Sequence, residues 1–204
     1  MGISEGWLSE PAPLPQRIPD AVSLTPRYAI SEQHGDGARK VGIIDDRKAS
    51  GVDAVTSTHD TAVPDSLGVF LAIISYYWLV APGRGLRAAS SDFPHAYKTI
   101  GIPCDAGKFS SVLPGPPTGP LLVAQIRTNP FGRTRAPANW GWVAKLLQWA
   151  LLTCFGIHLP IYLDDCFLVE AGATVESAYQ CANAFIALCG VKLGKFSHRH
   201  LLPA

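Results

Sequence analysis

Two neighbouring aspartates, Asp164 and Asp165, interrupt an otherwise apolar stretch of the chain. Residues 161–163 before them and 166–169 after them have the length and composition of short β-strands. The pattern therefore predicts a β-hairpin whose tight turn holds both carboxylates. Aspartate is common in turns for conformational reasons alone, yet a flexible solvent turn would not need apolar flanks. A hairpin anchored in a core can hold two repelling carboxylates rigidly, which suits a hard cation such as Mg²⁺.

Further elements follow from the spacing of apolar residues and from proline and glycine positions. One helix is expected to begin near Pro137 and to stop at Gly156, because apolar residues recur every three or four positions at Val143, Leu146, Leu147, Ala150 and Cys154. A second helix should run from Thr174, as its N-cap, to Cys189. A third lies within residues 61–80. Strands are expected at residues 40–46, 86–91 and 121–126, the last in a hairpin with its tip at 114–120. This order predicts an α+β fold with an antiparallel sheet and helices on one face.

The composition favours a folded protein inside the cell. Hydrophobic residues make up 48% of the 204 and charged residues 16%, enough for a packed core. The net charge of +1 gives no support for nucleic-acid binding, so that case depends on particular residues. The five cysteines form no CxxC pair, which predicts reduced, mostly buried thiols in the cytoplasm or nucleus. The apolar run at 67–82 predicts a core helix and no membrane span. The tryptophans at 140, 142 and 149 are also expected in the core.

A third carboxylate, Asp92, follows the strand expected at 86–91. Because strand ends in a sheet can converge, we expect Asp92 and Asp164 to share one site. Two metal ions roughly 3.5–4 Å apart at such a site can activate a hydroxyl and stabilise a leaving phosphate. The pair Asp45-Asp46, by contrast, is interpreted as a helix cap and receives no metal.

These acids stand in segments that resemble the motifs of one family, the reverse transcriptases. Tyr162-Leu163-Asp164-Asp165 looks like the YxDD box of that family. The other matching segments, in order, are residues 39–52 of a fingers element, Asp92 to Tyr97, Pro130 to Pro137, and Gly190 to Lys195. The resemblance covers about residues 6–196. A YxDD box alone would be weak evidence, whereas several motifs in the right order are a strong signal.

The resemblance implies a polymerase palm, with an antiparallel sheet backed by helices, and partial fingers. A Pro-rich extended segment at 1–26 would precede the fingers and palm at 27–196, and a tail would occupy 197–204. The family also carries a primer-gripping hairpin and a thumb after the motif that contains Lys195. Only nine residues follow Lys195, so we expect the thumb to be absent.

The resemblance also implies the roles of individual residues. Asp92 and Asp164 would be the principal ligands of two Mg²⁺ ions, with Mn²⁺ as an alternative, and Asp165 would complete the acidic cluster. Tyr97 would lie under the sugar of the incoming nucleotide, where its ring excludes a 2′-hydroxyl. The implied nucleotide-binding set is Arg39, Lys40, Tyr97, Phe131, Gly132 and Lys195. Arg39 or Lys40 would contact the triphosphate, and Lys195 would lie near the leaving pyrophosphate.

The implied function is template-directed synthesis of DNA from deoxynucleotide triphosphates, on an RNA or DNA template–primer. The missing thumb and the near-neutral charge motivate an alternative, an inactive remnant that only binds nucleic acid. A viral-type RNA-dependent RNA polymerase is a further alternative, against which Tyr97 and Leu163 argue, since many RNA polymerases have glycine at the latter position. Without the motifs, Tyr97 would be interpreted as a core aromatic and Arg39-Lys40 as a solvated pair. His198-Arg199-His200 is interpreted as part of a frayed tail.

Overall fold

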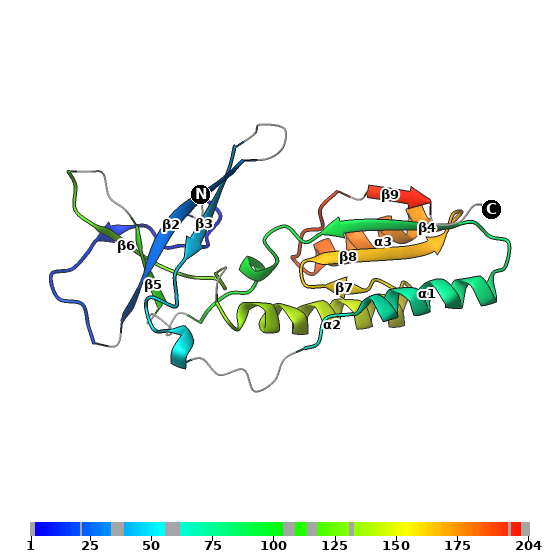
Figure 1. Ribbon diagram of the computed structural model, residues 1–204, viewed down its shortest axis with the longest axis horizontal. Helices are drawn as coiled ribbons and strands as arrows, with labels where there is room; N and C mark the ends of the chain where they lie inside the picture. Colours follow the sequence, from blue (N-terminus) through cyan, green and yellow to red (C-terminus); the bar gives the residue numbers. More distant parts are fainter. Residues whose placement is uncertain are drawn as a thin grey trace. The chain divides into compact units, whose positions relative to one another are not determined.

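The computed structural model describes residues 3–20, 22–33, 39–55, 62–103, 109–113, 118–130, 133–195 and 197–200. The chain divides into two compact units. Unit 1 comprises residues 1–59 and 97–136, and unit 2 comprises residues 60–96 and 137–204. The elements are labelled in Figure 1. The predicted α+β class is confirmed at this level: the described residues form helices together with small, largely antiparallel sheets.

Unit 1 is built on a five-stranded sheet of order β1-β6-β5-β2-β3. Its strands are β1 (Ala12–Pro13), β2 (Ser23–Gln33), β3 (Arg39–Asp45), β5 (Phe109–Leu113) and β6 (Leu122–Gln125). The strand expected at 40–46 and the hairpin before 126 are confirmed as β3 and the β5–β6 pair. The pairing of β2 with β5 is parallel, so this sheet is mixed. A small core of Leu8, Ala124 and Ile126 anchors the Pro-rich segment to β6.

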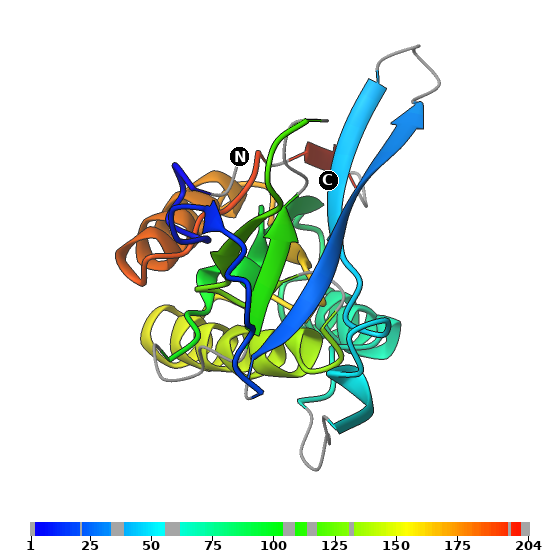
Figure 2. The same cartoon turned by 90° about the vertical axis from the view of Figure 1, so that its left-hand side faces the viewer.

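Strands β2 and β3 form a long antiparallel ribbon, which Figure 2 shows extending beyond the other strands of unit 1. At its base Arg27 lies opposite Asp45 and binds both of its carboxylate oxygens, at 2.7 and 2.9 Å. The neighbouring Asp46 accepts a hydrogen bond from the Ala49 N–H at 2.9 Å. Both acids of this pair therefore have structural partners. They do not cap a helix, contrary to the interpretation from the sequence: Asp45 ends β3, and Asp46 caps a turn.

Unit 2 holds a four-stranded, fully antiparallel sheet of order β7-β8-β4-β9 (Figure 1). Its strands are β4 (Leu86–Asp92), β7 (Ile161–Tyr162), β8 (Asp165–Ala171) and β9 (Ser197–His200). The helices are α1 (Leu67–Val80), α2 (Ala136–Phe155) and α3 (Val175–Leu188), of which α1 and α3 pack on β8. Gly156 and Gly190 have φ of 67° and 77° and end α2 and α3, as glycine at this position commonly does. The predicted helices and the central hairpin are confirmed.

The predicted burial of the helices was wrong in part. Trp140 is fully buried, but Trp142 and Trp149 on the same helix are 52% and 63% exposed. Of α1, Ile73 is the buried residue, while Trp78 and Leu79 are more than half exposed. A helix on a small sheet buries one stripe, and apolar residues elsewhere on it stay in contact with water. Within the described ranges, no helix combines the length and apolarity that crossing a membrane requires.

The segment expected to be a frayed tail forms part of the sheet instead. β9 pairs with β4 from Ser90 opposite Ser197 to Arg87 opposite His200. The two serine hydroxyls are 3.0 Å apart and hydrogen-bonded. Without β9, β4 would present a row of unpaired backbone groups at the sheet edge, which explains why the segment pairs there.

Asp65 ties the segment before α1 to α2 and β7. Its carboxylate pairs with Lys145 and accepts hydrogen bonds from Gln148 and, at 3.0 Å, from the Ile161 N–H. Burial opposes ionisation of this side chain, but the three donors outweigh burial and lower the pKa of Asp65 below its ordinary value. The ionised carboxylate is therefore a structural clamp of unit 2.

Replacing Asp65 by asparagine is expected to lower the free energy of unfolding at neutral pH by about 1–3 kcal/mol, because three donors lose a charged acceptor. A carboxylate with a lowered folded pKa stabilises the fold above its unfolded pKa of about 4, and loses this contribution as pH falls through the folded value. Urea unfolding should therefore show the two chains converging below about pH 4. Asp20→Asn, at an exposed turn, is the control. A pH-independent difference would contradict the assignment.

Candidate functional site

Two adjacent strands of unit 2 bring three carboxylates to one end of the sheet. Asp92 is the last residue of β4 and lies directly opposite Asp165, the first residue of β8. Asp164 precedes Asp165 in the turn between β7 and β8. Asp92 and Asp165 are exposed and Asp164 is half-buried. The strand pairing brings Asp92 beside the neighbouring pair Asp164 and Asp165, which lies far from it in the sequence.

The carboxylates repel one another. Partial burial, followed by the charges of Asp164 and Asp92, raises the pKa of Asp165 above its ordinary value. Arg27 pairs with Asp45 and Lys145 with Asp65, but no ion pair between described residues includes Asp92, Asp164 or Asp165. Negative charge is therefore concentrated at this sheet end without an ion-pair partner among the described side chains, in contrast to Asp45, which Arg27 neutralises.

The backbone beside these acids adopts an unfavourable conformation. Among the described non-glycine residues, those with positive φ are His95, at 60°, and Leu163, at 53°. Leu163 immediately precedes Asp164, and His95 follows Asp92 by three positions. Left-handed backbone is sterically disfavoured for such residues, and it tends to occur where a functional arrangement is held in place by its surroundings. The two strained residues thus coincide with the two chain segments that carry the acids.

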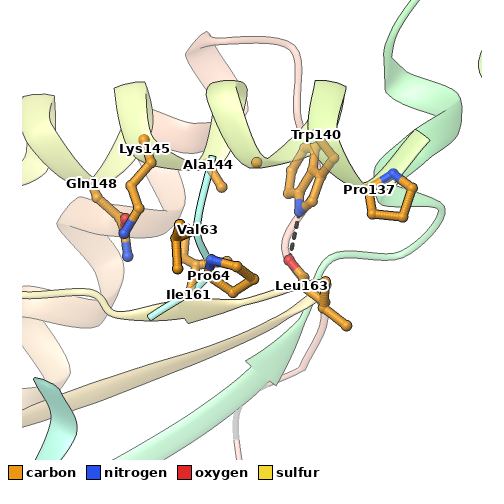
Figure 3. A pocket seen from close by; sticks show the side chains of 10 residues that line it. Val63, Pro64, Pro137, Trp140, Ala144, Lys145, Gln148, Ile161 and Leu163 are labelled. Carbon is orange, nitrogen blue, oxygen red and sulfur yellow. Dashed lines mark hydrogen bonds between the residues drawn. The ribbon is translucent and has the colours of Figure 1, made fainter. Parts of the chain in front are cut away.

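Hydrogen bonds join the segments. The Phe93 N–H, next to Asp92, donates to the Asp164 carbonyl at 2.6 Å. The indole Nε1–H of Trp140 donates to the Leu163 carbonyl at 2.6 Å (Figure 3). The rings of Phe93 and Trp140 meet edge to face, with centroids 5.0 Å apart. The turn before β8 and the end of β4 are therefore fixed relative to each other.

Gly194 lies against Asp92. Its N–H donates to the Asp92 carbonyl at 2.8 Å. A Cβ at position 194 would overlap the Asp92 carboxylate oxygen Oδ1 and come within 3.0 Å of Cγ and 3.1 Å of the carbonyl oxygen. Because glycine has no Cβ, the Asp92 carboxylate can occupy this space beside residue 194.

The donor set fits a divalent cation of the Mg²⁺ type only in part. Within the ranges that the structure describes, no three His, Cys, Asp or Glu side chains are arranged as a metal site. Mg²⁺ is, however, commonly held by one or two carboxylates together with waters and substrate phosphates. The uncompensated oxygens of Asp92, Asp164 and Asp165 meet this smaller requirement. These are the residues that would hold the ion.

Cys166, which follows Asp165, does not belong to the donor set. It is fully buried, and this burial raises the pKa of its thiol to about 12. A thiol that stays protonated at neutral pH is neither a metal ligand nor a nucleophile. Cys166 is a core residue, as expected, but the prediction that the cysteines are mostly buried was wrong, because Cys154 and Cys189 are exposed.

Of the other residues expected at the site, Lys195 belongs to unit 2, whereas Arg39, Lys40 and Tyr97 belong to unit 1. Exposed Lys195 directly follows Gly194 and so comes near the Asp92 backbone. Arg39 begins β3 in unit 1, where its Nε donates to the Ser31 hydroxyl at 2.7 Å. Lys40 is the next residue of β3, opposite Glu32. Tyr97 is half-buried in the 3₁₀ turn Ala96–Thr99. Phe131 and Gly132 lie outside the described residues.

Sequence reasoning missed the supporting residues. Trp140 was interpreted as core only, and Phe93 and Gly194 received no role of their own. The available signals were the aromatic residue directly after Asp92 and a glycine directly before Lys195. Neither signal specifies a contact, because each contact joins segments distant in sequence.

No protein-family model matches the chain, and the search of curated proteins found no match to it.

Proposed function

We propose that the chain is a nucleotidyltransferase of the reverse transcriptase type, which extends a primer with deoxynucleotides along an RNA or DNA template. One observation carries the proposal: Asp92, Asp164 and Asp165 meet at adjacent strand ends with no cationic side chain paired to them among the described residues. The stability of the fold gains nothing from such a cluster, whereas a reaction that needs divalent cations does. The motif resemblance supplies the reaction type.

In this proposal the residues of the chain position charge. Asp92 at the end of β4 and Asp164 in the turn before β8 would present their oxygens at a spacing that the β4–β8 pairing sets. Bound divalent cations would supply the charge that makes a primer 3′-hydroxyl acidic and that offsets charge on the leaving pyrophosphate. Tyr97 would select against a 2′-hydroxyl, and Arg39, Lys40 and Lys195 would attract the triphosphate. Most of the catalysis would therefore come from positioning and electrostatics.

The test is primer extension on an RNA template with Mg²⁺ and either deoxynucleotides or ribonucleotides. Extension with deoxynucleotides that stops on removal of divalent cations is the expected result. Extension with ribonucleotides instead would favour an RNA polymerase. A folded chain that binds template–primer and extends nothing would favour an inactive, nucleic-acid-binding remnant.

A further inference from the structure

The indole N–H of Trp140 donates a hydrogen bond to the turn that carries the acids. The side chain is 0% exposed, and its indole N–H donates to the carbonyl of Leu163 at 2.6 Å, as Figure 3 shows. Leu163 is the residue immediately before Asp164. A buried indole N–H needs an acceptor, and here the acceptor is one specific carbonyl of the hairpin turn.

The acceptor carbonyl belongs to a strained residue. Leu163 has φ of 53°, a conformation in which the Cβ of an L-residue crowds the backbone. Such a conformation persists only where surrounding contacts favour it. The hydrogen bond from Trp140 fixes the orientation of the Leu163–Asp164 peptide and, with it, the direction in which the Asp164 side chain leaves the backbone.

The same side chain also contacts the strand that carries the other principal acid. The Trp140 ring packs edge to face against Phe93, with 5.0 Å between centroids and 63° between planes. Phe93 follows Asp92, is 1% exposed, and donates its N–H to the Asp164 carbonyl at 2.6 Å. Trp140 therefore contacts both segments whose separation determines the distance between Asp92 and Asp164.

The residues around Trp140 leave its ring little space to move. The cavity beside it, lined by Val63, Pro64 and neighbouring side chains of α2, measures about 10 Å³, less than a ligand needs (Figure 3). The next residue, Gly141, lies so close to Ala62 that an added Cβ would come within 2.9 Å of the Ala62 Cβ. Within these tight surroundings the indole supplies a donor directed at the Leu163 carbonyl, which a phenyl ring lacks.

We propose that Trp140 is a positioning residue that holds Asp164 at the separation from Asp92 needed to bind a divalent cation. The proposal rests on the proposed function for its consequence in catalysis, but not for its consequence in metal binding. It assigns the indole N–H, and not the bulk of the ring, as the group responsible. Removing the N–H while keeping an aromatic ring should therefore weaken metal binding in a chain that still folds.

The variant is Trp140→Phe, and Mn²⁺ binding followed by electron paramagnetic resonance is the first measurement. We expect Mn²⁺ affinity to fall about tenfold or more, the size typical for loss of a partner that orients a metal ligand. In primer extension, the Mg²⁺ concentration for half-maximal rate should rise by a similar factor, with an unchanged KM for template–primer. Trp149→Phe, 63% exposed on the same helix, is the matched control and should change neither quantity.

A Trp140→Phe chain that folds, by urea unfolding, and keeps native Mn²⁺ affinity and Mg²⁺ requirement would overturn the proposal. If that variant does not fold, site-specific benzothienylalanine at position 140, which retains the bicyclic shape without the N–H, gives the same two readings. Suppose that the native chain binds Mn²⁺, that Asp164→Asn and Trp140→Phe each weaken this binding, and that the native chain extends no primer. This result would support the positioning role and refute the polymerase. Native Mn²⁺ binding that is unaffected by Asp164→Asn would overturn the positioning role.

Discussion

Primer extension by the Asp164→Asn chain is expected to fall about a thousandfold below that of the native chain, the upper range for loss of one preorganised electrostatic group. The substitution keeps the size of the side chain and removes its charge. Asp164 lies in the turn beside the opposed pair Asp92 and Asp165, so the loss lowers the charge available to a cation. The measurement is single-turnover extension on an RNA template with Mg²⁺.

The same substitution should leave the fold intact or stabilise it slightly. Partial burial, followed by the charges of Asp164 and Asp92, raises the pKa of Asp165, so removing the Asp164 charge relieves part of this unfavourable interaction. In urea unfolding, we expect the Asp164→Asn chain to have a free energy of unfolding at least as large as that of the native chain, although primer extension is lost. The control is Asp20→Asn, which removes an exposed carboxylate of unit 1 and should change neither primer extension nor the free energy of unfolding. Extension that survives Asp164→Asn would remove this residue from the proposed chemistry.

The hairpin and the strand before Asp92 could be predicted because their signals are local. Short apolar runs on both sides of Asp164-Asp165 specify two strands and a turn, which the structure contains. Asp92 lies opposite Asp165 in the β4–β8 ladder, whereas the shared metal site stays a prediction. The exact register, with Asp92 opposite Asp165, could not be predicted, since pairing over so long a separation is determined by packing of the whole sheet. The lack of a cationic partner among the described residues likewise required coordinates.

Strand β2 was missed for a specific reason. Its sequence contains Pro26, and proline within a run argues against a strand because it lacks a backbone donor. In the structure Pro26 falls at the last position of the parallel β2–β5 pairing, opposite Val112, after which β2 pairs with β3 alone. A proline is tolerated at such a position, where the ladder changes partner.

The exposure of α2 could have been predicted more accurately. Trp140, Ala144, Leu147 and Leu151 follow the helical spacing of three and four and are all buried. Trp142 and Trp149 fall outside this stripe and are exposed. The stripe expected from the sequence was rotated from this one: of its residues Leu147 is buried, whereas Leu146 and Cys154 are exposed. The three tryptophans were counted as apolar mass without their angular position. The donor role of Trp140 was a different kind of omission, because no pattern within α2 indicates the Leu163 carbonyl.

Gly194→Ala is expected to reduce primer extension about a hundredfold, because a displacement of a reacting group by about 1 Å has an effect of that size. The new Cβ would overlap Oδ1 of Asp92 and lie 3.0 Å from its Cγ. The hydrogen bond from the Gly194 N–H to the Asp92 carbonyl holds the two backbones together. The Asp92 carboxylate must therefore rotate away from its present position beside Asp164 and Asp165, so the affinity for Mn²⁺ should also fall.

Gly42→Ala is the matched control, since a Cβ there meets only the Ile30 carbonyl oxygen, at 3.9 Å. It should leave extension within about twofold of the native rate, as expected for a substitution with ordinary contacts. Full activity in a folded Gly194→Ala chain would mean that the orientation of Asp92 in this structure is not the one used in the reaction. Loss of both activity and Mn²⁺ binding, with little change in urea unfolding, would instead locate the effect at the Asp92 carboxylate and not in the fold.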